Sequence, residues 1–546
     1  MHMLWLGLIG CGGGGSAADT LDARYMQVMF DVGSADRDTT RNVHNKEARR
    51  RKAAAETARI AFFQDPEIQK KIAAAADAPA DSIEHVKGQS YKRAQLVVAP
   101  WTKEEKAEEI RLLGVLDEAA STDASWSAQD GTVTIKLGRN WSEVSKEADK
   151  LDDAARQSLA ETWVNHRTGA FGADLQALVT LRNTVAKRAG YPTYWELALA
   201  GQGLTPADVD AIVGELTPVV TPIHAAINAK ITAAAADTSD TFANHPLLRR
   251  RAGLDVGGDE ADAWFDGDQA EDRILTSLQA MGVTTSGWQV YTGPTRYVRP
   301  GVYGFSIIPP EHLAVVMSVD ERYSTWPYEA LAHETGHLVW WRFLSAESAA
   351  SPALWEPTAP WFEGFAQFFE RVVFEPTFAE KYMPEFPVAD REMLRAWRAR
   401  DAAESISDAI VETRTEQKLY ADPSDLGAIC AFAAGLRHEI QGGPEAPKAT
   451  NGIVYDASLW SSLLWNDPAY SQNYLYAYST EAWMWEGVTK QVGDPVGNPK
   501  VGPFVRDHIV QVPAGTPFPD RLAALTPTTR ADALAAYLAI GAPPAP

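Results

Sequence analysis

The sequence predicts a mostly α-helical protein that carries one small antiparallel β-sheet next to a helix with the pattern HExxH. Long segments rich in Ala, Glu, Lys and Arg show helical periodicity, and β-branched and aromatic runs gather between residues 290 and 319. The HExxH pattern, at residues 333–337, follows these β-prone runs closely. No shift in composition divides the chain, so we expect one large helical domain over residues 20–546.

The composition excludes several classes of protein. The chain has 546 residues, of which 72 are acidic and 50 basic, and its net charge of −22 argues against binding to nucleic acid. With 45% hydrophobic residues, the bulk of the chain is not disordered. No apolar run reaches the roughly 18 residues that a membrane span requires. The two cysteines, Cys11 and Cys430, are not expected to pair, and Cys430 is predicted to be a buried structural thiol.

Residues 1–19 form a separate region that resembles a lipoprotein signal followed by a glycine-rich tether. Residues 8–11, Leu-Ile-Gly-Cys, resemble the lipobox of bacterial lipoproteins, and a glycine run follows Cys11. Only His2 precedes the apolar residues, whereas a secretory signal opens with positive charges, so we expect the start codon to lie further upstream. Lipidation at Cys11 would anchor the protein in the cell envelope, as a periplasmic or surface lipoprotein. The alternative is an ordinary glycine-rich terminus of a cytoplasmic protein.

The first half of the chain is predicted to be helical with one strand. Residues 21–121 have the periodicity of a set of antiparallel helices. Residues 131–137 alternate like a strand, and helix resumes over residues 141–199 with a break at 190–192. Further helix is expected up to residue 282, the last part of it as an acidic helix pair.

The β-prone runs precede a second long helical region. The strands of the small sheet are expected at four runs separated by Pro and Gly, namely 290–291, 297–298, 302–308 and 314–319. The later elements are helices and one loop, with helices at 327–420, 425–440 and 459–488 and a Gly/Pro loop at 441–451. The last helix is rich in aromatic residues.

The HExxH pattern places His333 and His337 one turn apart on the same face of a helix that begins near Thr325 and Pro327. Two imidazoles at this spacing can bind one Zn²⁺, and Glu334 then lies beside the open coordination position as a general base for water. We therefore expect one zinc ion per chain. The alternative is a pair of structural histidines.

A tetrahedral zinc site needs a third ligand from the protein, and we predict Glu363. This acid lies in the aromatic segment 358–370, where an ionised carboxylate needs a cationic partner. Gln367 and Glu370 lie on the same helix face and would fix the ligands through hydrogen bonds. The alternative for Glu363 is a solvent-facing acid. Two other glutamates compete as the third ligand, Glu329 and Glu347. Neither has the apolar sequence neighbours of Glu363.

These residues resemble the gluzincin metallopeptidases, in particular the thimet oligopeptidase and oligoendopeptidase family and the peptidyl-dipeptidase A (angiotensin-converting enzyme) family. In both families the third ligand is a glutamate on the helix after the HExxH helix, and Glu363 lies 26 residues after His337. The spacing of Glu363, Gln367 and Glu370 is similar to the oligopeptidase pattern, and residues 360–364 are similar to the dipeptidase one. An N-terminal helix motif of both families is matched by residues 181–183, Ala186 and residues 190–191.

The resemblance implies a two-lobed helical fold with a deep central cleft, in which residues 302–319 supply an edge strand. Both families stabilise the oxyanion with a downstream tyrosine, which here would be Tyr474 or, as second choice, Tyr470. Ordinary aromatic core packing is the alternative for both. The oligopeptidases also carry a histidine shortly before that tyrosine, where residues 465–467 offer no imidazole. Two histidines from other parts of the chain could supply this imidazole instead, namely His438 and His312. The alternative for both is a structural role.

The predicted function is that of a zinc metallopeptidase that hydrolyses short peptides. Glu334 would take the proton of the attacking water and pass it to the leaving amine. The first alternative is a carboxypeptidase or dipeptidyl carboxypeptidase of the same fold, which needs a cationic anchor for the C-terminal carboxylate. The second is a surface lipoprotein that binds zinc without turnover. We expect peptides to be the binding partners and expect no binding of nucleic acid. Contact with a membrane is expected only through Cys11, and the protein is expected to be a monomer.

Overall fold

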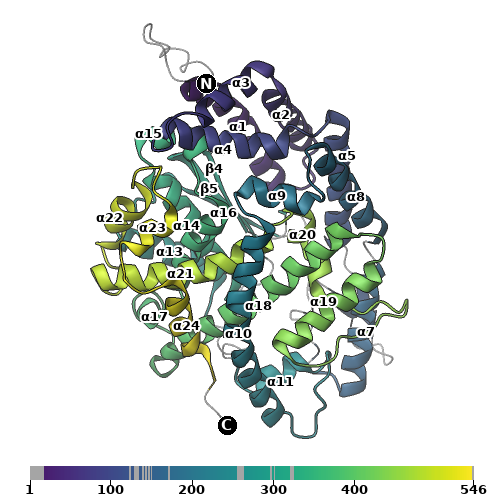
Figure 1. The fold of residues 1–546 in the computed structure, drawn as a ribbon. Helices are drawn as coiled ribbons and strands as arrows, with labels where there is room; N and C mark the ends of the chain where they lie inside the picture. Colours follow the sequence, from purple (N-terminus) through teal and green to yellow (C-terminus); the bar gives the residue numbers. More distant parts are fainter. Residues whose placement is uncertain are drawn as a thin grey trace.

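The computed structural model describes most of the chain and shows a mostly helical protein, as predicted (Figure 1). The lipobox-like residues 8–11 lie outside the described part. Residues 17–543 are described apart from 122–123, 128–133, 138–140, 142–143, 145–147, 149, 170–171, 255–263, 295–297, 300–301 and 320–324.

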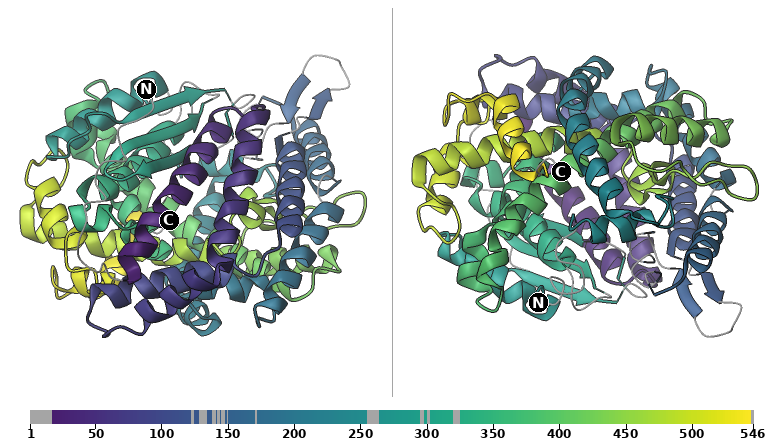
Figure 2. Two further views of the ribbon diagram at one scale, coloured as in Figure 1. Left: turned by 90° about the horizontal axis from the view of Figure 1, so that it is seen from above. Right: turned by 90° about the horizontal axis from the view of Figure 1, so that it is seen from below.

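The N-terminal region consists of helices, as predicted for residues 21–121. Asn45 caps one helix by accepting from the Ala48 backbone N–H, and Asp65 caps the next, which opens with Pro66. Helix α1 packs along α2 (Figure 2, left), and α3 packs against α4. The bounds are α1 Ala17–Arg41, α2 Lys46–Gln64, α3 Pro66–Ala76, α4 Ile83–Val98 and α5 Lys103–Ser121.

A hairpin and a second group of helices follow. The strands β1 (Ala124–Ser127) and β2 (Thr134–Leu137) are antiparallel, which confirms the predicted strand in its described part. The hairpin lies at the periphery of the molecule (Figure 2). The predicted break is confirmed, because Gly190 adopts φ 87° just after α8. The helices are α7 Asp153–Gly169, α8 Gly172–Arg188, α9 Tyr194–Gln202, α10 Pro206–Ala234, α11 His245–Arg251 and α13 Gly267–Ala280.

The small sheet is mixed, whereas an antiparallel sheet was predicted. Its strands are β3 (Gln289–Gly293), β4 (Val302–Ile308) and β5 (Glu311–Ser318), in the order β3-β5-β4. β4 and β5 pair antiparallel, but β3 pairs parallel with β5. The apolar runs reveal where strands form, but they do not reveal which strand lies in the centre. Val298, expected in a strand, lies in a bend, and Tyr297 is outside the described residues.

The helix with the HExxH pattern lies in the middle of a stack of elements. It packs against β4 and β5 and also against the next long helix, α16, which in turn packs against α21. Two glycines permit these close contacts: a Cβ on Gly336 would lie 2.8 Å from Ala366 Cα, and one on Gly364 would lie 2.4 Å from Thr480 Cβ. The helices of this region are α14 Trp326–Phe343, α15 Ala346–Ala349, α16 Ala359–Val372, α17 Pro376–Tyr382, α18 Arg391–Ala421 and α19 Leu426–Gln441.

The predicted aromatic helix at residues 459–488 is interrupted. A 3-10 turn (Ala457–Trp460) and α20 (Ser462–Asn466) come first, and α21 begins only at Ser471 and ends at Val492. Pro468 and Ala469, which adopts φ 55°, break the helical path. Tyr470 therefore lies at the N-cap of α21 rather than inside a helix.

The C-terminal helices complete the fold. They are α22 Val501–Val505, a π-helical turn Arg506–Val510, α23 Phe518–Ala523 and α24 Arg530–Gly541. Cys430 is a buried free thiol on α19, as expected. Among the described residues, no helix combines the length and apolar character needed to cross a bilayer.

Candidate metal centre

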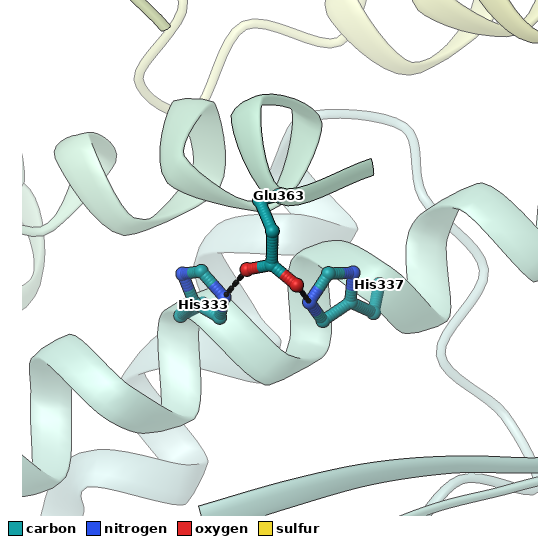
Figure 3. A group of neighbouring side chains, drawn as sticks. All are labelled: His333, His337 and Glu363. Carbon is teal, nitrogen blue, oxygen red and sulfur yellow. Dashed lines mark hydrogen bonds and ion pairs between the residues drawn. The ribbon is translucent and has the colours of Figure 1, made fainter. Parts of the chain in front are cut away.

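Three side chains from two neighbouring helices converge on one point. Helix α14 presents His333 and His337 on the same face, and Glu363 on α16 points at both imidazoles from the other side (Figure 3). His333 Nε2 lies 3.1 Å from one carboxylate oxygen of Glu363, and His337 Nε2 lies 3.7 Å from the other. The three ligand atoms all lie within 4.8 Å of one another, a group that could hold one metal ion.

The protonation states of His337 and Glu363 suit metal binding. Burial lowers the pKa of His337 to about 4, so its ring is neutral at neutral pH. Burial alone would raise the pKa of Glu363, but the neighbouring histidines and a hydrogen bond from Tyr470 lower it to about 2. A neutral imidazole and an ionised carboxylate are the forms that ligate zinc.

A buried ionic chain orients His333. Its Nδ1 lies 2.8 Å from Glu370 Oε2, and the other oxygen of Glu370 lies 2.7 Å from Arg398, which is 1% exposed. Arg398 also donates to Gln367 and lies 3.5 Å from Glu481. Although burial lowers the pKa of His333, its contacts with the two glutamates raise it well above the usual value. Hydrogen bonding of this kind fixes the direction of the ligating nitrogen.

The predicted supporting residues divide between two roles. Glu370 contacts His333 directly, whereas Gln367 contacts Arg398. Arg398 was missed at the sequence level, because it lies in the long, highly charged helix α18 with no flanking motif. Its role is visible only once α18 packs against α21 and the Arg398 side chain reaches Gln367 and Glu370 on α16.

His337 is surrounded by aromatic rings instead. Its ring centroid lies 4.2 Å from that of Phe362 and 6.3 Å from that of Trp341. Its buried Nδ1 has no hydrogen-bond partner among the described residues. Packing therefore sets the orientation of this imidazole.

Glu334 lies beside the three potential ligands and contacts the edge strand. The backbone N–H of Gly304 on β4 donates to Glu334 Oε2 at 2.5 Å. A Cβ on Gly304 would lie 2.8 Å from this oxygen, so only glycine permits the approach. Burial, opposed by His333 and assisted by Glu363, raises the pKa of Glu334 to about 7. A carboxylate with a pKa near neutrality can both accept and return a proton.

Two tyrosines at the start of α21 lie at the same site. The hydroxyl of Tyr470 donates to Glu363 Oε1, and the ring of Tyr474 lies 5.9 Å from that of Tyr470. The Tyr474 hydroxyl has no hydrogen-bond partner among the described residues. Burial, with the charges of Glu363 and Glu334, raises the pKa of Tyr474 well above the usual value. Tyr474 is therefore a protonated donor close to both acids.

The segment before α21 is held in place by three other helices, α8, α9 and α18. The Ala469 backbone N–H donates to Glu416 at 2.7 Å, and the Ala469 carbonyl accepts from Gln202 at 2.7 Å. Arg182, from the predicted N-terminal helix motif, donates to the Trp465 carbonyl at 2.7 Å. The motif therefore supports the segment that carries the tyrosines.

The other candidates do not join the cluster. Glu329 lies behind it, 3.5 Å from Arg398, and Glu347 is exposed on the short helix α15. His438 is exposed on α19, and His312 is exposed in β5. Neither histidine replaces the imidazole that the oligopeptidases carry before their tyrosine.

Two solved structures share the architecture over nearly their whole length. A crystal structure reported as an oligoendopeptidase F superposes with a TM-score of 0.71, at 14% identity, over 96% of this chain and 92% of that one. A structure named BsuCP gives 0.65, at 12% identity, over 96% and 98% of the two chains. The chain has the oligoendopeptidase fold. No family model and no curated protein matches the sequence.

The oligoendopeptidase fold confirms the predicted architecture. At such identities the superposition establishes a common fold, and chemistry has to be argued from the residues of the site.

Proposed function

We propose that the chain is a zinc-dependent metallopeptidase that hydrolyses short peptides. The observation that carries this proposal is the group of His333, His337 and Glu363, with Glu334 beside it, in a protein of the oligoendopeptidase fold. Two imidazole nitrogens and one carboxylate form a donor set that zinc prefers in hydrolytic sites, and the ligand atoms are close enough to share one ion. When bound, zinc would polarise the peptide carbonyl and acidify water.

The protein's own residues supply the proton transfers. Glu334, with a pKa raised to about 7, accepts a proton from the attacking water and delivers it to the leaving nitrogen. The backbone N–H of Gly304 holds this carboxylate in place. Because the pKa is close to neutrality, both transfers are feasible at neutral pH.

The tyrosines have different roles in this proposal. The hydroxyl of Tyr474 forms no hydrogen bond with the described residues, and its raised pKa keeps it protonated. It can therefore donate a hydrogen bond to the oxyanion that forms during attack. The hydroxyl of Tyr470 is already bound to Glu363, so it orients that carboxylate. This assignment keeps Tyr474 as the first choice and gives Tyr470 a positioning role.

Cleavage of a defined peptide mixture, followed by mass spectrometry, tests the proposal. The chain beginning at Ser16 is compared with Glu334→Gln, which keeps the size of the side chain and the acceptor for Gly304. We expect the native protein to cut internal or C-terminal bonds and the variant to lose at least about 1,000-fold in rate, since both proton transfers are lost. Zinc bound without cleavage by either protein would instead support a binding protein.

The location of the protein is a further part of the proposal. We propose that Cys11 is lipidated and anchors the enzyme in the cell envelope, on the strength of the lipobox-like residues 8–11. Metabolic labelling with a fatty acid should mark the native chain and leave Cys11→Ser unlabelled. Equal labelling of the two chains would contradict the anchor.

A further inference from the structure

A cavity of about 300 Å³ lies where helix α4 meets the segments on either side of α15 and α23. Its volume is at the lower end of the range of pockets that bind small ligands. Two tryptophans, two arginines and one carboxylate distinguish its lining from the apolar core. They are Trp340, Trp361, Arg93, Arg521 and Glu356.

The cavity adjoins the metal centre. Trp340 follows His337 by three residues on α14, whereas Trp361 packs against Tyr476 and Phe518 on the side of α16 that faces away from Glu363. Phe362 contacts both places, with its ring 4.2 Å from that of His337 and 6.3 Å from that of Trp340. The ring of Phe362 therefore lies between the cavity and the metal centre.

Glu356 is the acidic residue in the lining of the cavity. Its side chain is open to solvent, yet it lies deep enough in the protein that burial raises its pKa to about 7. The charge of Glu363 adds to this shift, so the two carboxylates lie near each other. Neither arginine of the cavity forms an ion pair with Glu356.

The two arginines lack acidic partners. The guanidinium of Arg93 has no hydrogen bond or ion pair with any described residue. Arg521 donates to the carbonyls of Ile509 and Thr516, at 2.7 and 3.0 Å, but its Nη2 has no acceptor in the described part of the chain. Unpaired arginines are unexpected in a protein with 72 acidic and 50 basic residues.

Burial makes these unpaired cations unfavourable. It lowers the pKa of Arg93, and it lowers the pKa of Arg521 to about 10. A half-buried guanidinium without an anion has lost hydration, and for Arg521 the two carbonyl groups replace only part of it. An anionic group entering the cavity would offset this cost with charge-assisted hydrogen bonds, to which the planar guanidinium is suited.

We propose that this cavity is a substrate subsite in which Arg93 and Arg521 bind a carboxylate of the peptide. The inference rests on the proposed peptidase function and adds the chemical class of peptide that is preferred. The carboxylate can come from two sources, the C-terminus of the peptide or an acidic side chain near the cleaved bond. Trp340 and Trp361 supply apolar surface for the rest of that residue.

Binding to the Glu334→Gln variant tests the subsite without turnover. The probes derive from one parent sequence: the neutral peptide amide, the same peptide with a free C-terminal acid, and a series of amides in which Glu replaces one position at a time. Affinity is measured by calorimetry. We expect at least one carboxylate-bearing peptide to bind about tenfold more tightly than the neutral amide, as for a hydrogen bond to a charged group.

Substitution of the arginines identifies the site of this preference. Arg93→Gln and Arg521→Gln, each combined with Glu334→Gln, should remove the preference for the carboxylate-bearing peptide. Arg50→Gln, an exposed arginine on α2, is the matched control and should retain it. If Arg521→Gln does not fold, Arg521→Lys keeps the charge without the planar fork and should weaken the preference.

The outcomes separate the two proposals. A preference for the free acid assigns the cavity to the C-terminus, and a preference for Glu at one position assigns it to a side chain. Equal binding of all probes, or a preference that persists in both arginine variants, overturns the subsite. Hydrolysis of the neutral amide by the native enzyme would then still support the peptidase, whereas absence of any hydrolysis would overturn the peptidase itself.

Discussion

His333 and His337 lie one turn apart on α14 and face the same carboxylate, yet their surroundings are opposite. His333 is held through Nδ1 by Glu370, which is paired with the buried Arg398. His337 Nδ1 has no partner in the described part of the chain, and its ring packs against Phe362. Accordingly the pKa of His333 is raised well above its usual value, whereas burial lowers that of His337 to about 4.

The difference shows two ways to orient a metal ligand. A hydrogen bond fixes direction but requires buried charges, which must all be paired. Aromatic packing fixes a ring without charges and depends on volume and shape. Zinc affinity should therefore respond to isosteric changes of charge in the residues around His333, and to changes of side-chain volume in the residues around His337.

The largest expected effect comes from Glu363, because it contacts both histidines and Tyr470. Glu363→Gln keeps the shape but removes the charge, so zinc affinity should fall by more than about 100-fold and peptide hydrolysis with it. Glu347→Gln, at an exposed position on α15, is the matched control. Zinc content after dialysis, measured by mass spectrometry, checks the result, and a full equivalent of zinc in Glu363→Gln would contradict it.

The next largest loss of zinc affinity is expected from Glu370, which contacts His333 and not His337. Glu370→Gln retains a hydrogen-bond acceptor but loses the negative charge, and we expect zinc affinity to fall by about 10- to 100-fold. Glu375→Gln is the control, since Glu375 is also a buried acid paired with arginines, Arg371 at 3.0 Å and Arg395 at 2.7 Å. If the two variants lose zinc equally, the loss reflects general destabilisation rather than orientation of His333.

A smaller effect is expected on the side of His337. Phe362→Leu leaves space beside the imidazole, which should reduce zinc affinity by less than about tenfold and stability by about 1 kcal/mol. Phe378→Leu, in the buried part of α17, should cost similar stability with no change in zinc affinity. Thermal unfolding and competitive zinc titration measure both quantities. A loss larger than that of Glu370→Gln would reverse the ranking of the two sides.

The smallest expected effect is on the pH dependence of stability and comes from Glu416. This buried acid accepts a hydrogen bond from Ala469 at the break before Tyr470 and forms no ion pair with a described residue. Burial raises its pKa to about 8, so the folded chain retains a proton that the unfolded chain releases near pH 4.3. The stabilisation is complete below the unfolded pKa and is lost as pH rises through about 8. Glu416→Gln should keep the hydrogen bond to Ala469 and flatten the decline in Tm between about pH 5 and pH 8.

The control for this prediction is Glu445→Gln, at an exposed position in the loop after α19. Its Tm should follow the native pH dependence. An unchanged decline in Glu416→Gln would mean that another group binds the proton.

Local patterns in the sequence predicted much of this arrangement. The helical periodicity of residues 21–121 and the spacing of His333 and His337 are short-range features, because one helix determines each of them. Glu363 could be proposed because its aromatic neighbours exclude water. The structure brings all three side chains together.

The remaining features depend on contacts between distant segments. The parallel pairing of β3 with β5 depends on which strand occupies the centre of the sheet. The break at Ala469 depends on Glu416 and Gln202 from other helices, in addition to the preceding proline. Arg398 and Arg93 look like ordinary charged residues on helices, and only their packing shows that one is paired and the other is not.

Stepwise return of zinc to the chelator-treated native chain tests the central claim most directly. Hydrolysis of an internally quenched peptide is followed as zinc is added, with Glu334→Gln as the control that binds the ion. We predict that activity is absent without metal, rises in proportion to added zinc and reaches its plateau at one equivalent per chain. Activity that survives complete removal of zinc, or that appears equally in Glu334→Gln, would contradict the account.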